Sequence, residues 1–451
     1  MSLTVYAALL GYPVFAAALF WMLPARRALL ACYLVGWLFL PMTGWMIPGI
    51  PDYTKPSAVT FVPLVCACLF DSARVLRFRP SLLDLPILVW CLIPIATAAS
   101  NGLGIYEGVS DCFDRTVEWG LPYLTGRIYF TEPGAVTDLA LAIVVGGMLY
   151  MPLCLWEAKM SPRLHEQVYG FQQHDWIQTL RFEGWRPQVF MQHGLAVAMF
   201  MAMSTVVGAW LMWSRTASAI RGFPLWAVVA GLFVTTILCR SGLAAMCMVA
   251  GLGALAWMKY VRLRIALLVL VLASPMYIYA RTAGNWSAEP LVAAARAVSV
   301  DRSQSLQARI DSEDILWEHA RERRFLGWGR GRTRPQDEEG RDLGIQDGYW
   351  IIAVGLNGLI GLTAFMGVIL LPAVVMIRRL PAAAWTSATL GPAGVLSVVL
   401  ALVMCDNVMN AMYNPIWILC AGAVAGTAIS LRRNVRARAL PQPHSPGWVQ
   451  R

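Results

Sequence analysis

The chain has 451 residues, of which 58% are hydrophobic and only 14% are charged. A soluble surface needs roughly a quarter charged residues, so this composition, with a mean hydropathy of +0.57, excludes a set of soluble domains. The net charge of +10 does not indicate nucleic-acid binding, because basic cytoplasmic loops are typical of membrane proteins. We therefore expect contacts with membrane lipids and no nucleic-acid partner.

Apolar runs near the spanning length of ~20 residues recur along the chain and predict an all-α polytopic membrane protein with about 12–13 transmembrane helices. Twelve spans are expected near residues 3–22, 28–48, 57–71, 86–100, 136–156, 189–213, 224–239, 241–257, 265–280, 348–371, 388–405 and 412–430. A thirteenth candidate lies near 109–130. It holds four charged residues that are costly to bury in lipid, namely Asp111, Asp114, Arg115 and Glu118.

Short loops between these spans are rich in basic residues. The clusters are Arg26 and Arg27; Arg74, Arg77 and Arg79; Lys259, Arg262 and Arg264; Arg378 and Arg379; and Arg432, Arg433, Arg436 and Arg438. The charge-bias rule places them in the cytoplasm. Residues 157–187 and 281–346 then fall outside, and only a crossing near 109–130 keeps that parity. We therefore favour thirteen crossings with a cytoplasmic C-terminus, and the first apolar run, which has no clear cleavage site, as a retained span.

Four regions are expected: N-terminal membrane helices over 1–280, a large external loop over 281–346, C-terminal membrane helices over 347–430 and a disordered cytoplasmic tail over 431–451. The loop holds eleven arginines and eleven acids. Its stretch "SLQARIDSEDILWEHARERRF" predicts an amphipathic helix from apolar residues at Leu306, Ile310, Leu316, Trp317, Ala320 and Phe325. The glycines of "GWGRG" are expected to end that helix.

Arginines at the external ends of helices are unusual under the charge-bias rule. Arg186 is one of them, in the stretch "RFEGWRPQVFMQHG", which enters a span and also holds Arg181, Glu183 and His193. A single such arginine can simply extend its charge into water or pair with a nearby acid.

Two further arginines are expected on the same side. Arg240 lies in "CRSG", a turn between two spans that is too tight to reach far into water, and Arg309 lies in the loop helix. The alternative to isolated arginines is a shared site in which Arg186, Arg240 and Arg309 converge on phosphate, because the guanidinium fork matches phosphate oxygens in two-point contacts.

Asp347 stands just inside the last large apolar segment, "GIQDGYWIIAVGLNGLIGL". One interpretation is a helix cap, since aspartate accepts the free backbone N–H groups of a first turn. The other is a catalytic carboxylate, and both roles can coexist. His165, His174 and Asp175 show no metal-ligand spacing, so neither a metal nor another cofactor is expected.

Three stretches, in this order, resemble the O-antigen ligase and polymerase superfamily of bacterial envelope glycan assembly. They are the turn "LCRSGLAAM", the loop helix "SLQARIDSEDILWEHARERRFLGWGRG" and the following span "QDGYWIIAVGLNGLIGL". The Arg186-Pro187 pair is also similar to the external arginine before a span in this family. The resemblance covers about residues 170–380.

This resemblance implies transfer of a glycan from a polyprenyl diphosphate carrier to a hydroxyl of a lipid or glycan acceptor. The reaction would occur on the periplasmic face of the bacterial inner membrane. Arg186 and Arg240 match the family's diphosphate-binding arginines. The family's ligases have a histidine where this chain has Asp347, which weakens the case for a lipid A-core ligase and makes a polymerase at least as plausible.

An aspartate at that position can accept the proton of an attacking hydroxyl, with Glu183 and Asp175 as reserve candidates for the base. Two other classes stay open: a transporter or flippase of lipid-linked sugars, and a non-catalytic membrane scaffold.

Overall fold

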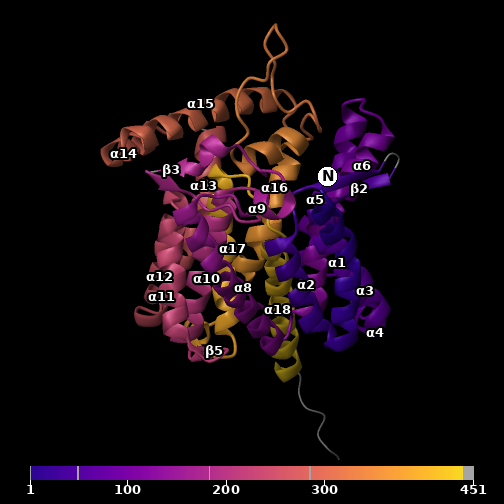
Figure 1. Ribbon diagram of the computed structural model, residues 1–451, viewed down its shortest axis with the longest axis vertical. Helices are drawn as coiled ribbons and strands as arrows, with labels where there is room; N and C mark the ends of the chain where they lie inside the picture. Colours follow the sequence, from indigo (N-terminus) through magenta and orange to yellow (C-terminus); the bar gives the residue numbers. More distant parts are fainter. Residues whose placement is uncertain (1, 48–49, 182, 284–285, 440–451) are drawn as a thin grey trace, which may run out of the picture.

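The structure is a computed structural model that describes residues 2–47, 50–181, 183–283 and 286–439. These residues are mostly helical, which confirms the predicted all-α polytopic membrane fold (Figure 1). Three short antiparallel hairpins join helices within the described ranges: β1 (Gly44–Ile47) with β2 (Ile50–Thr54), β3 (Leu180–Arg181) with β4 (Gly184–Trp185), and β5 (Ala219–Ile220) with β6 (Phe223–Pro224).

Within the described residues, eight helices are long and apolar enough to cross a membrane. They are α1 (Leu3–Met22), α5 (Leu85–Ser100, preceded by the 3-10 turn η1 at Leu82–Asp84), α8 (Pro133–Met160), α10 (Gly194–Trp213), α12 (Gly242–Tyr260), α13 (Ile265–Ala283), α16 (Tyr349–Arg379) and α17 (Gly391–Met409). Four more helices fall on the remaining predicted spans: α2 (Ala25–Phe39), α3 (Lys55–Phe70), α11 (Leu225–Leu238) and α18 (Pro415–Ala439).

Further helical elements, most of them short, lie between the spans. They are α4 (Ser72–Leu76), α9 (Leu164–Tyr169), α14 (Glu289–Val298), α15 (Val300–Glu322), η3 (Trp176–Thr179) and η4 (Ala382–Thr386).

The span predicted at 28–48 is wrong in its second half. Helix α2 ends at Phe39, and the apolar run continues as the strand β1. Pro41 explains the difference, because the residue before a proline is pushed out of the helical region.

The thirteenth candidate forms a nearly continuous helix made of α6 (Ile105–Arg115), η2 (Thr116–Gly120) and α7 (Leu121–Tyr129). Gly108 packs against Ala98 near the end of α5, while Arg127 pairs with Asp84 just before its start. The segment therefore runs antiparallel to α5 along its whole length, as expected for a thirteenth crossing.

The two ends of the bundle differ in size and charge. The loop face, at the top of Figure 1, carries residues 161–193, α14, α15 and the chain from 323 to 348. The basic face, at the bottom, carries the short arginine-rich loops. The hydroxyl of Ser2 donates to the Tyr169 carbonyl (2.7 Å), so α1 begins at the loop face, whereas α18 ends at the basic face.

The predicted loop helix is confirmed as α15, whose buried face includes Ile310, Leu316 and Ala320. Phe325 was expected on this face, but it lies beyond the helix end and is exposed. The prediction that the glycines of "GWGRG" end this helix is wrong, because α15 ends at Glu322, with Arg323 as its C-terminal cap. Gly327, Gly329 and Gly331 have positive φ and shape the chain after the helix.

The predicted disordered tail over 431–451 needs a correction at its start. Residues 431–439 prolong α18 because this stretch, "LRRNVRARA", is rich in good helix formers. Residues 440–451 lie outside the described part.

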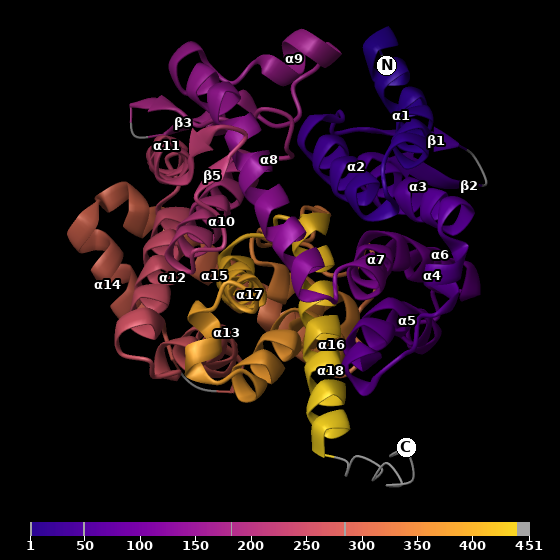
Figure 2. The ribbon, with the colours of Figure 1, turned by 90° about the horizontal axis from the view of Figure 1, so that it is seen from below.

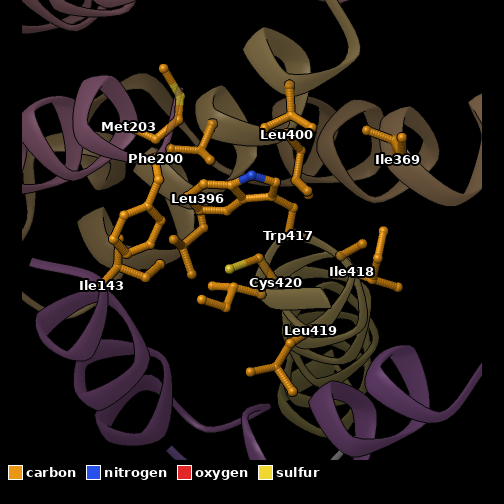
Figure 3. Packing of buried hydrophobic residues seen from close by; sticks show 14 of the residues in the cluster. Ile143, Phe200, Met203, Ile369, Leu396, Leu400, Trp417, Ile418, Leu419 and Cys420 are labelled. Carbon is orange, nitrogen blue, oxygen red and sulfur yellow. The ribbon is translucent and has the colours of Figure 1, made fainter. Parts of the chain in front are cut away.

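Helices α10 and α17 form the centre of the bundle, and Figure 2 shows α17 near its middle. These two helices are buried on nearly every side and are largely apolar all round, as expected of helices surrounded by other helices. Figure 3 shows Trp417 of α18 packed among Phe200, Leu396 and Leu400, with ring centroids of Trp417 and Phe200 5.9 Å apart. This core fixes the helix ends that form the loop face.

Helix α16 is interrupted at Asn357 and Gly358. The chain that leaves α15 inserts into the break: Trp328 N–H donates to the Gly355 carbonyl (2.8 Å), and Leu359 N–H donates to the Arg324 carbonyl (2.8 Å). Gly358 has φ of 63°, and a Cβ there would overlap the backbone of Phe325. The break thus ties the loop face to the following span.

Candidate functional site

Four arginines gather on the loop face from separate parts of the chain. Arg181 lies in β3, Arg186 follows β4, Arg240 lies between α11 and α12, and Arg309 lies in α15. These include all three arginines that the sequence predicts to bind diphosphate.

Arg186 is almost buried, with 8% of its surface exposed. Its Nη2 donates to the carbonyl oxygen of Arg240 at 3.0 Å, and its side-chain stem lies against Gly194. Nε of Arg186 has no hydrogen-bond partner among the described residues. Burial, followed by the positive charges of Arg181 and Arg309, lowers the pKa of Arg186 to about 10. It therefore stays a cation at neutral pH, with a buried donor left for a ligand.

Arg240 occupies the tight turn that "CRSG" predicts, with φ of 51°. Its guanidinium lies on Gly184, where a Cβ would overlap it, and Nη1 donates to the Arg181 carbonyl at 3.3 Å. The turn is fixed on its other side by Ser241, whose hydroxyl accepts from the first turn of α12. Arg240 and the β3–β4 hairpin thus hold each other in place.

Asp347 forms an ion pair with Arg309, with Nε and Oδ2 3.2 Å apart. The cap residue of α16 is Gly348, and no side chain caps that helix. The capping interpretation of Asp347 is therefore wrong: its side chain turns to α15 instead of its own helix. Nη1 of Arg309 also donates to the Met409 carbonyl at 3.3 Å. The pair therefore joins α15 to the start of α16 and to the end of α17.

His193 caps α10 at the edge of this cluster. Its Nδ1 accepts from the backbone N–H of Leu195 at 3.0 Å, which leaves the proton of the neutral ring on Nε2. Burial, followed by the positive charges of His174, Arg186 and other arginines, lowers the pKa of His193 to about 3. His193 is thus a neutral hydrogen-bond donor and a poor base at ordinary pH.

The two reserve carboxylates lie at the margin of the cluster. Glu183 is exposed in the turn of the β3–β4 hairpin and forms no ion pair within the described ranges. It precedes Gly184, against which the guanidinium of Arg240 packs. Asp175 is exposed as well and caps the short helix η3, accepting from Ile177 N–H at 3.1 Å. Asp347 therefore forms an ion pair with an arginine of the cluster, whereas Glu183 and Asp175 do not within the described residues.

His165 has a structural role. Its Nε2 accepts from the Met42 N–H at 3.1 Å, and Nδ1 lies 2.9 Å from the Phe171 carbonyl oxygen. Both ring nitrogens are used in the fold. In the part of the chain that the structure describes, there is no group of three or more His, Cys, Asp or Glu residues that could hold a metal ion.

The short linker between α17 and α18 is central to the site, although the sequence did not single it out. Arg309 contacts its first residues, and Gln192 donates to the Tyr413 carbonyl at 2.7 Å. The Tyr413 hydroxyl donates in turn to the Glu118 carbonyl. The polar letters "NAMYN" between two apolar runs were the available signal.

A second charged group faces the loop from the thirteenth crossing. Arg330 pairs with Asp111 (2.7 Å) and Asp114 (2.9 Å), while Arg115 lies over the Trp90 ring at 3.8 Å. These pairs neutralise Asp111 and Asp114, two of the four charges that made residues 109–130 a weak candidate for a span.

No known protein-family model matches this chain, and a search of curated proteins finds no significant relative.

Proposed function

We propose that this membrane protein transfers a glycan from a polyprenyl diphosphate carrier to an acceptor hydroxyl at the loop face. The observation that carries the proposal is the meeting of Arg186, Arg240 and Arg309 beside the carboxylate of Asp347. Arginines suit a diphosphate because each offers a planar fork of donors and keeps its charge.

In the proposed reaction the acceptor oxygen attacks the anomeric carbon of the sugar. A new carbon–oxygen bond forms to the acceptor while the bond from that carbon to the diphosphate oxygen breaks. The diphosphate leaves with the bonding electrons, and the arginines stabilise its added negative charge. The proton of the acceptor hydroxyl passes to Asp347, and direct displacement inverts the anomeric centre.

The Arg309–Asp347 pair is suited to both tasks at once. The two side chains are 29% and 38% exposed, so incoming groups can reach them. Arg309 can turn one donor to the diphosphate while holding the carboxylate in place. His193, as a neutral donor, adds a hydrogen bond to a phosphate oxygen without competing for the proton.

Placement in the bacterial inner membrane with a periplasmic loop face, and membership in the O-antigen ligase and polymerase superfamily, belong to this proposal. They rest on the sequence resemblance and on the charge of the basic face. Either a ligase or a repeat-unit polymerase fits the arrangement.

A transporter fits less well because, outside residues 105–129, the buried charges of the described spans lie near helix ends. Lys55 begins α3 and donates to the carbonyls of Leu40 (2.8 Å) and Phe190 (2.7 Å). Asp406 lies three residues from the end of α17, where it accepts from Asn410 at 2.6 Å. These groups stabilise the loop-face ends of helices, whereas a transport route needs charge near the membrane centre.

The test is complementation of a strain that lacks the gene, with surface glycan length scored by gel and protein level by immunoblot. The variants are Asp347→Asn, Asp347→His and Arg240→Ala. We expect Asn to reduce transfer by about 100-fold or more, because it removes the base without changing shape, and His to restore part of it. Matched controls are Asp342→Asn and Arg341→Gln, which alter exposed ion pairs of the same loop.

Two outcomes would redirect the proposal. If Asp347→Asn behaves like wild type while Arg240→Ala fails, the base lies elsewhere, and Glu183 is next. If neither change affects the glycan, the transferase proposal is wrong.

A further inference from the structure

A cavity of 550 Å³ opens at the basic face, on the opposite side of the molecule from the candidate site. It lies between α4 with the chain that follows it, the end of α7 with the residues after it, and residues 426–430 of α18. The side chains that line it include four arginines, namely Arg74, Arg77, Arg79 and Arg127, and two acids, Asp71 and Glu132. The volume is in the range typical of small-ligand sites, roughly 300–1,000 Å³.

Two of the four arginines are already engaged. Arg127 forms a two-point ion pair with Asp84, at 2.6 and 2.9 Å, and is nearly buried. Arg74 lies over the Tyr129 ring and 3.9 Å from Glu132, which also pairs with Arg26 at 3.3 Å. These contacts shape the wall of the cavity and leave little of either charge for a ligand.

The other two arginines are available. Arg77 and Arg79 are exposed, and within the described ranges neither forms an ion pair. Of the two lining acids, Glu132 is paired with arginines, and Asp71 has no arginine at ion-pair distance among the described residues. The two available arginines therefore outnumber the one available acid, and the net charge of the cavity is positive. An anion entering it would gain two guanidinium forks.

Large apolar side chains flank the same short stretch of chain. Leu69, Leu76 and Leu82 are 74%, 84% and 86% exposed, and each lies within three residues of a lining residue. Exposed leucines beside arginines at the end of a membrane bundle match the boundary between lipid tails and headgroups.

We propose that this cavity binds the phosphate headgroup of an anionic membrane lipid from the leaflet at the basic face. Arg77 and Arg79 hold the phosphate, and the leucines contact the acyl chains. The apolar rim favours a lipid over a free phosphate ion, which would gain nothing from it. The proposal does not depend on the reaction at the loop face.

The test uses the purified full-length protein in a neutral detergent. Phosphatidylglycerol, phosphatidylcholine and inorganic phosphate are titrated separately, and bound molecules are counted by native mass spectrometry. Arg77→Gln/Arg79→Gln removes the two available cations. Its matched control, Arg215→Gln/Arg221→Gln, removes two exposed arginines of the same face outside the cavity. A third variant, Ala73→Trp, fills the cavity and keeps every charge.

We expect the apparent Kd for phosphatidylglycerol to rise about tenfold in Arg77→Gln/Arg79→Gln and to stay within about twofold in the control pair. Ala73→Trp should also weaken binding, and phosphatidylcholine should bind poorly throughout. Two results would overturn the proposal: an equal loss of phosphatidylglycerol affinity in the two double-arginine variants, or no loss of affinity in Ala73→Trp. Either result would mean that binding depends on the general charge of the surface and not on the cavity. Binding of inorganic phosphate with the same dependence on the variants would assign the cavity to a soluble ion and overturn the lipid assignment.

Discussion

Two of the ion pairs that anchor helix α15 differ in how much water reaches them. Arg281 and Glu313 pair at 3.3 Å with only 4% and 6% of their side chains exposed, and Tyr277 and Trp350 also donate to that carboxylate. The Arg309–Asp347 pair is several times more exposed. Burial decides what each pair contributes, because a lost partner leaves a stranded charge only where water cannot replace it.

We therefore expect Glu313→Gln to lower the free energy of unfolding by about 3 kcal/mol, because it leaves Arg281 as a buried cation with one exposed acid. Asp347→Asn should cost less than about 1 kcal/mol, as is usual for exposed pairs. Detergent-phase unfolding of the two variants checks this. A large loss of stability in Asp347→Asn would mean that its effect on activity reports folding, not chemistry.

His193 gives the stability a predictable pH dependence. Its pKa is about 3 in the folded protein, against 6.5 for an ordinary histidine. Between these two pH values, His193 is therefore protonated in the unfolded chain and neutral in the folded protein. Stability is complete above the ordinary pKa and falls as the pH drops toward the folded pKa. Between pH 7 and pH 5 the loss from this residue is about 2 kcal/mol.

The variant His193→Asn should remove that part of the pH dependence, since asparagine also caps a helix but does not titrate. Thermal unfolding of both proteins at pH 7 and pH 5 gives the comparison. His165 remains in both and contributes equally, so the difference belongs to His193. Parallel curves would contradict the assignment.

The arginines of the site could be predicted from the sequence because a positive charge at an external helix end violates a general bias. Asp347 was found for a similar reason, as an acid beside an apolar run. The role of the Tyr413 linker could not be predicted in this way, because its contacts with Arg309 and Gln192 come from tertiary packing across more than one hundred residues. The orientation of Asp347 toward α15 instead of α16 has the same origin.

Two glycines decide how closely α7 and α18 cross. A Cβ on Gly126 would overlap the Leu419 carbonyl oxygen, and a Cβ on Gly422 would overlap the Tyr123 carbonyl oxygen. Small residues at such a crossing let two membrane helices approach until their backbones touch. The contact between α7 and α18 also positions part of the wall of the basic cavity, since residues of both helices line that cavity.

We expect Gly422→Ala to destabilise the protein by about 2 kcal/mol, because neither backbone can yield to the added methyl group. The control is Gly253→Ala in α12, where an added Cβ meets open space. It should be neutral, or slightly stabilising through its better helix propensity. Unfolding midpoints of the two variants measure the contrast, and similar midpoints would mean that the α7–α18 crossing is looser than described.

At the same scale, the positions of most helices could be predicted, but the break in α16 could not. The letters "GLNGLIGL" contain an Asn-Gly pair, which favours a turn, but the apolar run continues on both sides of it and the span was predicted as one helix. The reason is the segment from α15, whose backbone supplies partners for the groups that the break frees.

For the whole molecule, the number of crossings is the feature on which the sidedness depends. The sequence predicted an odd number from loop charges alone, and residues 105–129 form a helix that runs the length of α5. Membrane sidedness itself is set by insertion, and the charge distribution is the only information on it in the chain.

Cysteine labelling of intact cells with an impermeant maleimide tests both the sidedness and the thirteenth crossing. The sites are Glu107→Cys and Gly134→Cys, exposed at the two ends of residues 105–134, with Glu339→Cys at the loop face and Arg262→Cys at the basic face as references. We expect Glu107→Cys to label like Glu339→Cys from outside, and Gly134→Cys to react only after lysis, like Arg262→Cys. If positions 107 and 134 label together, the segment does not cross. If the two references are reversed, the candidate site faces the cytoplasm, where the proposed transfer to a surface glycan could not take place.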